Sequence, residues 1–496
     1  MALIKYADYR PDVSDYQSES SRMILNAAPQ GDGYGPHPSF SAYSQSLPDA
    51  CRGAFYAMMT DGSTATFAGT ATRLYRMDNT TFAWADVSGP TDGYSALSSD
   101  AHWQFVQTGN FVFATQANSV LQIFDVTTDT QFSDALGSPP QASYIAVVGP
   151  FIVLSGILGA PFRIQWSGMN EFNADDAWTS GIHFSDYQDF PDGGLTRGIA
   201  GGTQSGIIFQ DQMIRSMAYM PGSPIVFQID KISDKMGLFA PYSIIRSGSN
   251  IFFYAGQGFH KIAPGSEPQP IGREKVDRTF IDDLDIGEMQ FFMGAADPRS
   301  TRVYWAYKSV SGASGGYDKL LGYDVLLDRF FPVMMSGQFI FGVCPGGITL
   351  EALDDIAPIV NGTPSLDAMT LSLDDYPTAV QPRLGQFDAT ATLGFITGTA
   401  LEATIQTGEQ GDDFNRLTIR GFRPITDAQQ VFGSLFYRDT QQAAPIQSRE
   451  VGLSRIGRCD MMRDARYSRF QVRIPAGTNW NFAAGVVPDM DGGAQQ

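Results

Sequence analysis

Four histidines are the residues best suited to act as general bases or metal ligands, and their spacing favours neither role. They are His37, His102, His183 and His260. No two of them lie at a short metal-ligand spacing, and none has a cysteine nearby. His183 is close to Asp186 and Asp189, but the chain contains no Gly-x-Ser-x-Gly nucleophile motif. We therefore expect no hydrolytic triad, and we expect His102 and His260 to be ordinary, partly buried histidines.

Carboxylates gather in one short run, Asp282, Asp283, Asp285 and Glu288. A carboxylate pair could cleave a glycosidic bond, and an oxygen-rich loop could bind calcium. The spacing departs from the Asp-x-Asp-x-Asp-Gly calcium loop, so a solvated acidic turn is the favoured interpretation, with a short helix over Asp282–Met289. The Gly-rich stretches 31–36 and 201–206 do not match a phosphate loop and predict turns.

Three cysteines, Cys51, Cys344 and Cys459, are far apart in the sequence and odd in number. Their positions fit neither a disulfide framework nor the spacing of a zinc site. We therefore expect them to be small, reduced residues of the core. With no coherent catalytic, cofactor or metal site in so long a chain, we expect a protein that is not an enzyme and uses no cofactor.

Arginine is concentrated near the C-terminus. Between residues 415 and 473 there are eleven Arg, five acids and no Lys, a surplus of six positive charges in a chain whose net charge is −19. Because the guanidinium group tolerates desolvation and binds carboxylates bidentately, these arginines could form contacts between copies of the chain. The candidates are Arg416, Arg420, Arg423, Arg463, Arg466, Arg469 and Arg473. The alternative, Arg on the solvated face of each strand, is equally compatible with the pattern and stays open.

The elements that carry these residues are predicted to be short strands. The chain has 52 Gly, 28 Pro and 12% aromatic residues, a composition typical of many tight turns. Six strand-rich units recur at intervals of roughly 35–50 residues, the length that one β-propeller blade needs. They lie at 64–87, 103–126, 143–168, 201–230, 244–262 and 301–333. The sequence thus predicts an all-β fold with a propeller of about six blades, and a large sandwich or stack of hairpins is the alternative.

Four regions are expected along the chain: an N-terminal extended segment (1–50), the propeller (51–356), a linker (357–382) and a C-terminal β-sandwich (383–496). The apolar run 144–162 is nearly long enough for a membrane span, but Gly149 and Pro150 interrupt it, so two buried strands are expected instead. The first residues have no signal-peptide pattern, and export is not expected. The acidic net charge argues against a protein that binds nucleic acid through a general basic surface. It suits the wall of a DNA conduit, and it is also explained by the solubility of a large protein.

The order of several strand-and-turn motifs resembles a phage structural family, the tail nozzle or hub proteins of short-tailed phages, also called tail tubular protein B or packaged-DNA stabilisation proteins. The motifs run from Gly31 to Val487 and include GYGPHPSF, FAGTATRLYR, WQFVQTGNFVFAT, RIQWSG, GGTQSGIIFQDQMIRSM, PIVFQID, GQGFHKI, VDRTFIDDLD, GAADPRSTRVYWAY and RYSRFQVRIPAG.

The resemblance implies a virion protein, made in the host cytoplasm, that forms a ring expected to be a hexamer. The ring would lie below portal-adaptor proteins, beside tail fibres or tailspikes. It would retain packaged double-stranded DNA and conduct it during ejection without sequence-specific binding. The resemblance supplies no catalytic residues. The alternative function is a carbohydrate-binding or carbohydrate-cleaving tail propeller that acts on the host surface.

Overall fold

Short antiparallel strands joined by tight turns make up most of the computed structural model, which describes residues 3–14, 20–346, 381–411 and 414–492. The hairpin of β10 (Gln104–Thr108) and β11 (Phe111–Thr115) is typical. Its two-residue turn is Gly109-Asn110, where Gly109 has φ 55°, a value that glycine adopts without strain. Four-stranded sheets result wherever three such turns follow one another.

In the described part of the chain, seven sheets have four antiparallel strands each, and we call them blades 1 to 7. Blade 1 is β6 (Ala54–Met58), β7 (Thr64–Gly69), β8 (Leu74–Met77) and β9 (Trp84–Asp86); blade 2 is β10, β11, β12 (Gln122–Asp125) and β13 (Ser133–Asp134). Blade 3 is β14 (Ala142–Val148), β15 (Phe151–Ile157), β16 (Ala160–Trp166) and β17 (Asp186–Asp189); blade 4 is β18 (Thr196–Ala200), β19 (Ser205–Gln210), β20 (Ile214–Tyr219) and β21 (Phe227–Ser233). Blade 5 is β22 (Ile245–Ser247), β23 (Asn250–Ala255), β24 (Gly258–Ile262) and β25 (Gln269–Pro270); blade 6 is β26 (Met293–Ala296), β27 (Arg302–Tyr307), β28 (Tyr317–Asp324) and β29 (Arg329–Gly337).

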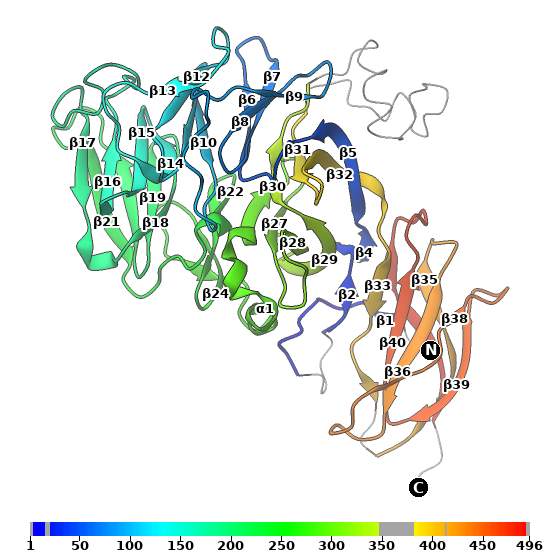
Figure 1. Ribbon diagram of the computed structural model, residues 1–496. Helices are drawn as coiled ribbons and strands as arrows, with labels where there is room; N and C mark the ends of the chain where they lie inside the picture. Colours follow the sequence, from blue (N-terminus) through cyan, green and yellow to red (C-terminus); the bar gives the residue numbers. More distant parts are fainter. Residues whose placement is uncertain (1–2, 15–19, 347–380, 412–413, 493–496) are drawn as a thin grey trace.

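Blade 7 closes the ring and is assembled from three separate stretches of sequence. Its strand order is β30 (Phe339–Val343), β31 (Arg383–Phe387), β32 (Thr392–Ala400) and β5 (Pro38–Ser46). β30 also contacts β6, the first strand of blade 1. The N-terminal strand β5 therefore fastens the last blade to the start of the propeller (Figure 1).

The predicted propeller is confirmed by this sheet order, with one blade more than the six units of the sequence. Each of the six units coincides with one of blades 1 to 6. The sequence pattern did not show the seventh blade, because its strands are not consecutive in the chain. β5 and β30 are about 300 residues apart, and a further long interval separates β30 from β31. A repeat with a fixed period in the sequence reveals only blades whose strands follow one another along the chain.

Aromatic and aliphatic side chains fill the spaces between neighbouring blades. Every residue of β7 is buried, and its Phe67 meets Phe124 of blade 2 with ring centroids 5.3 Å apart. The apolar run 144–162 forms β14 and β15 around Gly149-Pro150, as predicted. Among the residues that the structure describes, no helix has the length and apolar character needed to cross a membrane.

A two-sheet sandwich forms the second domain. One sheet has the order β3 (Ala27–Gln30), β4 (Gly33–Pro36), β41 (Ala483–Gly492), β35 (Leu417–Thr426), β39 (Cys459–Ala465), with β1 (Ile4–Lys5) paired to β41. The other has the order β2 (Ile24–Leu25), β33 (Ala403–Gln406), β40 (Tyr467–Ile474), β36 (Phe432–Arg438), β37 (Ile446–Gln447); β34 (Gln410–Gly411) pairs with β40 and β38 (Val451–Gly452) with β36. Phe422 and Phe470 meet across the core at 5.2 Å between ring centroids.

The expected domain boundaries need two corrections. Residues 383–400, expected to open the sandwich, form β31 and β32 of blade 7. The segment expected to be an extended N-terminal arm supplies β1 to β4 to the sandwich and β5 to the propeller. Strand partners so distant in sequence leave no local signal. The expected linker 357–382 lies outside the described residues except for its last two.

The propeller is thus inserted between β4 and β33 of the sandwich, and β29 contacts β2 and β3 where the domains meet. Asn26, with φ 55°, connects them: its Nδ2 donates to Glu402 O (2.8 Å) and its Oδ1 accepts from Met334 N (2.7 Å). Arg302 of blade 6 donates to Pro29 O (3.0 Å), and Arg329 is ion-paired with Asp8 (2.6 Å). Backbone and charge contacts therefore hold the domains together.

Helices are few and short in the described chain. They are α1 (Asp277–Asp283) and the 3-10 turns η1 (Pro191–Gly193), η2 (Pro241–Ser243) and η3 (Ile286–Phe291). The helix expected over Asp282–Met289 was wrong: α1 ends at Asp283, and η3 starts after Asp285, whose side chain accepts from Gly287 N. Asp285 is a good N-cap residue, so it starts a new turn and does not continue the helix.

Candidate functional site

The four histidines do not come together. His37, His102 and His260 are buried at separate places, and burial lowers the pKa of His37 and of His102 to about 4. His183 is exposed and lies 3.5 Å from Asp176. Asp186 accepts from Ser180, and Asp189 is ion-paired with Arg163. The histidines thus form no shared site.

The acidic run is held by neighbouring cations and hydroxyls. Asp283 accepts from Lys319 (2.7 Å) and Tyr307 (3.0 Å), and Asp285 accepts from Lys308 (2.5 Å). Glu288 accepts from Gln290, and Asp282 is exposed. None of these four carboxylates belongs to the lining of the large pocket described below. Within the described residues no group of three or more His, Cys, Asp or Glu is placed to hold a metal ion.

The three cysteines are free and buried, and burial raises the pKa of each thiol, to about 12 for Cys51 and about 11 for Cys459. They are therefore protonated, weakly reactive core residues at neutral pH.

The predicted interface arginines fall into two groups. Four make ion pairs inside the sandwich: Arg416 with Asp439, Arg420 with Asp491, Arg469 with Glu409, and Arg473 with Glu402 and Glu450. Arg423, Arg463 and Arg466 make no ion pair with described residues; Arg463 lies 6.0 Å from the Tyr437 ring centroid. Only part of the set therefore remains available to another molecule.

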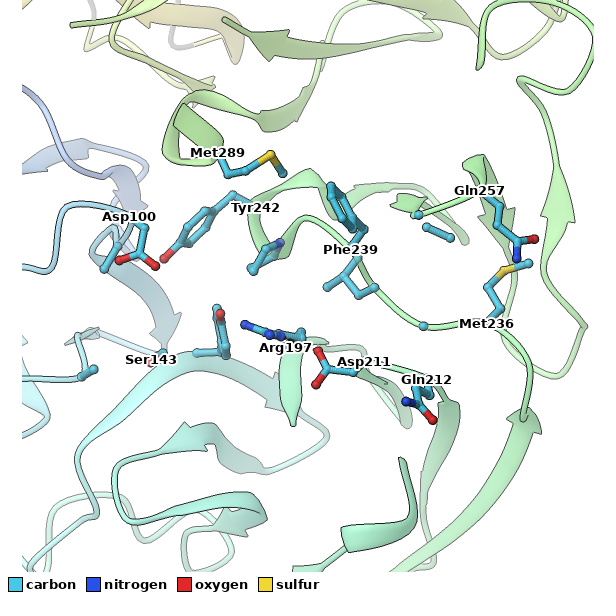
Figure 2. Close-up of a pocket in the computed structure, with 18 of the residues that line it drawn as sticks. Asp100, Ser143, Arg197, Asp211, Gln212, Met236, Phe239, Tyr242, Gln257 and Met289 are labelled. Carbon is cyan, nitrogen blue, oxygen red and sulfur yellow. Dashed lines mark hydrogen bonds and ion pairs between the residues drawn. The ribbon is translucent and has the colours of Figure 1, made fainter. Parts of the chain in front are cut away.

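A large pocket of about 840 Å³ opens on one face of the propeller (Figure 2). In a four-stranded meander the turn between the second and third strands lies at the same end as the connection to the next blade. We call this end of the blades the upper face, and the end with the other two turns the lower face. The lining comes from upper-face segments of blades 2 to 6, such as 98–101, 211–212, 234–242 and 255–257. Sequence reasoning missed this pocket because no two of these segments are neighbours in the chain.

Arg197 at the start of β18 is fixed on the pocket wall. Its Nε donates to Asp211 Oδ1 at 2.5 Å, while Asp211 Oδ2 accepts from Leu195 N at 3.0 Å. Both side chains stay partly exposed. Figure 2 shows the Arg197 guanidinium directed towards the side of the pocket where Ser143 lies, with the Asp211 carboxylate beside Arg197 on the opposite side.

Tyr242 and His102 close the propeller axis below the pocket. His102 N donates to Tyr242 Oη at 3.0 Å, and the two rings meet edge to face at 4.7 Å. The lowered pKa makes His102 neutral, and because Gln290 O can only accept, the His102 Nε2 carries the proton and donates to it at 2.6 Å. His102 also contacts Phe339 at 5.4 Å. Because these residues come from blades on opposite sides of the ring, they fill the axis at this level.

The pocket combines aromatic surface with scattered polar groups. Tyr144, Phe239 and Tyr242 supply rings, and Ser143, Gln212 and Gln257 supply hydrogen-bonding groups. Burial raises the pKa of Tyr242 to about 12, so its hydroxyl stays protonated at neutral pH. Asp100 and Asp234 lie on different connections, and Asp211 is engaged by Arg197. This arrangement can bind a polar ligand against aromatic rings.

Comparisons with known proteins bear on the architecture. No protein-family model and no curated protein matches the chain. The WD40 repeats of RRP9 match with 10% identity over 61% of this chain and 89% of theirs, at a TM-score of 0.38. The computationally designed Ika8 protein matches with 10% identity over 73% of this chain and 99% of its own, at a TM-score of 0.36. At these scores the assignment rests on the sheet order itself: the chain is a β-propeller with an attached β-sandwich.

Proposed function

We propose that the chain is a non-enzymatic structural subunit of a short-tailed phage, the tail nozzle or hub. In this proposal several copies form a ring, expected to be a hexamer, below portal-adaptor proteins and beside fibres or tailspikes. The ring retains the packaged DNA and conducts it during ejection. The order of the sequence motifs supports the proposal, as does a net charge of −19, which suits a wall that must not hold DNA.

The observation that carries the proposal is the presence of exposed apolar side chains at both ends of one connected two-domain body. Phe184 (53% exposed) and Ile225 (65%) are exposed on the propeller, and Ile456 (65%) and Met462 (67%) on the sandwich. Large apolar side chains exposed on both domains leave surface that another protein can cover. A subunit with two such ends is suited to assembly.

The filled propeller axis adds a constraint. His102 contacts both Tyr242 and Phe339 across the ring, so a DNA duplex has no passage through a single propeller. A conduit in the proposed assembly therefore lies between copies of the chain.

Purified particles of the phage that encodes the chain provide the test. We expect quantitative mass spectrometry to find the chain in a fixed number of copies, and antibody labelling in electron micrographs to locate it at the tail tip. Its absence from purified particles would overturn the proposal.

The aromatic, polar upper-face pocket favours one other function, binding of a host-surface glycan. Titration calorimetry with host polysaccharide would then show binding that Arg197→Ala and Tyr144→Ala weaken and that Leu326→Ala, on the lower face, leaves unchanged. Equal binding by all variants would rule out this pocket.

A further inference from the structure

An apolar groove of about 360 Å³ lies on the lower face of the propeller between blades 3 and 4. Its lining includes Phe151, Met169, Phe184, Tyr219, Met220 and Val226. Phe151 is fully buried, whereas Phe184 and Met220 are 53% and 40% exposed. None of the lining residues is charged. A hollow of this size accepts a branched aliphatic side chain with part of its flanking backbone.

The backbone around the groove is held in conformations that non-glycine residues avoid. His183 and Phe184 have φ values of 49° and 68°, and Asn170, next to Met169, has φ 55°. Such residues persist only where the surroundings enforce them, and they occur preferentially at ligand and partner sites. Hydrogen bonds fix this loop: Met169 N donates to His183 O (2.8 Å), and Asn170 N donates to Pro150 O (2.9 Å). The exposed Phe184 ring is therefore presented by an ordered loop.

The loop that supplies part of the groove lining is acidic. The loop 167–185, which carries Met169 and Phe184, contains Glu171, Asp175 and Asp176 and no Lys or Arg. Gly168 and Glu171 form an isolated antiparallel β-bridge, so Glu171 lies two residues from the groove-lining Met169 in a tight turn. Glu171 and Asp175 are exposed. An occupant with an apolar tip and a flanking cation would match this groove.

Such a tip occurs in the sandwich, in the turn 453–458 that joins β38 to β39; we call it the hairpin tip. Ile456 is 65% exposed, and Arg455 beside it makes no ion pair with described residues. The turn is fixed by Ser454 N donating to Arg458 O (2.8 Å) and by Gly457 N donating to Ser454 O (2.9 Å). Arg458 is ion-paired with Asp460 (2.5 Å) and Asp489 (2.7 Å). The tip is thus pre-formed, and little conformational freedom is lost when it binds.

Groove and hairpin tip lie at opposite ends of the molecule. Figure 1 shows β16, β17 and β21 at one end of the propeller, and β38 and β39 at the far side of the sandwich. One copy therefore cannot bring its own tip to its own groove.

We propose that the hairpin tip of one copy inserts into the apolar groove of a second copy, with Ile456 in the hollow and Arg455 facing Glu171. The inference rests on the proposed assembly function and names its contact surfaces. Two different patches meet, so the contact is heterologous: it closes into a ring when the rotation between copies permits.

A cysteine pair tests the contact. The double variant Ile456→Cys, Met220→Cys is introduced into phage particles by complementation, and the particles are oxidised. We expect a ladder of covalent multimers that collapses on reduction, whereas each single variant stays monomeric. Cys51, Cys344 and Cys459 are buried and should not interfere.

Incorporation into particles gives a second readout. Ile456→Asp should lower incorporation about tenfold, as expected for loss of a central interface residue. Ile446→Asp, which alters another exposed sandwich residue (58% exposed), should change incorporation less than twofold. Equal melting temperatures of the two variants would show that folding is intact.

The outcomes separate the two proposals. Particles that contain the double variant, show no ladder and incorporate Ile456→Asp normally would overturn the contact and leave the nozzle proposal standing. Absence of the chain from particles would overturn the nozzle proposal. In that case oxidation of the concentrated, purified double variant decides the contact alone, because a ladder supports it and its absence refutes it.

Discussion

Glu409 is a buried carboxylate whose charge is balanced by two arginines of the sandwich. Its side chain is 4% exposed and accepts from Arg438 at 2.8 and 2.6 Å in a bidentate pair, and Arg469 lies at 3.4 Å. Removing one partner of a buried pair leaves an uncompensated charge. We therefore expect Glu409→Ala to lower the free energy of unfolding by about 3–5 kcal/mol, measured by chemical denaturation.

Asp439→Ala is the matched control, because Asp439 is 53% exposed and pairs with the 45% exposed Arg416. Solvent screens such a pair, so its loss should cost less than about 1 kcal/mol. Equal effects of both substitutions would contradict the role assigned to Glu409.

Buried His37 and His102 should make the protein acid-sensitive. Their folded pKa values are about 4, against 6.5 for an unperturbed histidine, so the unfolded chain binds more protons between these values. Their stabilising effect is complete above about pH 6.5 and is lost as the pH falls towards 4, by roughly 3 kcal/mol for each histidine. Denaturant midpoints measured from about pH 7 to about pH 4.5 should fall accordingly.

Asp277 opposes this trend. Burial raises its pKa from 3.8 to about 6, so its contribution to stability grows as the pH falls through 6. Because this side chain is partly exposed, we discount the effect to about 1 kcal/mol. Asp277→Asn should therefore steepen the acid loss, and a shallower loss in this variant would contradict the assignment.

At the residue level, the sequence predicted the state of the cysteines. Cys51, Cys344 and Cys459 are buried thiols, as predicted from their isolation. The arginine surplus was visible, but its partners were not, because Glu409 and Arg469 meet only through the pairing of β34 with β40. Which arginines are free could not be predicted without that pairing.

At the level of elements, closure of the propeller depends on the pairing of β32 with β5. Gly394 of β32 faces Ala42, and a Cβ at Gly394 would lie 2.2 Å from Ser41 O. We expect Gly394→Ala to lower the free energy of unfolding by about 2–3 kcal/mol and to expose residues 38–46 to limited proteolysis.

Gly31→Ala is its control, since a Cβ at Gly31 would meet nothing within 4 Å. Its effect should stay within about 0.5 kcal/mol. Protection of residues 38–46 in the Gly394→Ala variant would show that β5 does not depend on this close approach.

Blades 1 to 6 could be predicted because each is a contiguous meander with its turn residues in place, such as Gly109-Asn110. Blade 7 and the first sandwich strands could not. Ile24 pairs with Ile405, and Ala42 pairs with Gly394. Turn chemistry and strand periodicity are local signals, and neither reports pairs so far apart.

At the level of the whole molecule, the sandwich needs both halves of the chain. The fragment 383–496 lacks β1 to β4 and carries β31 and β32 without their blade. We expect it to aggregate and to show no cooperative melting in circular dichroism, whereas the full chain melts cooperatively. A soluble fragment with a sharp transition would contradict this expectation.

The upper-face pocket also belongs to the whole molecule. Arg197, Asp100 and Gln257 come from three blades, and only ring closure brings them to one opening. Nothing in the local sequence around any one of them predicts the other two.

Because the propeller is inserted into the sandwich, paired strands of the sandwich are synthesised at very different times. Ile24 leaves the ribosome long before Ile405, its strand partner; at 5–20 residues per second the wait is roughly 20–80 seconds. During that time the nascent chain holds strands whose apolar faces have nothing to cover them, while blades 1 to 6 can already stack. Chaperones are therefore expected to protect strands β2 to β4 until the last strands emerge, and translation speed should affect the yield of folded protein.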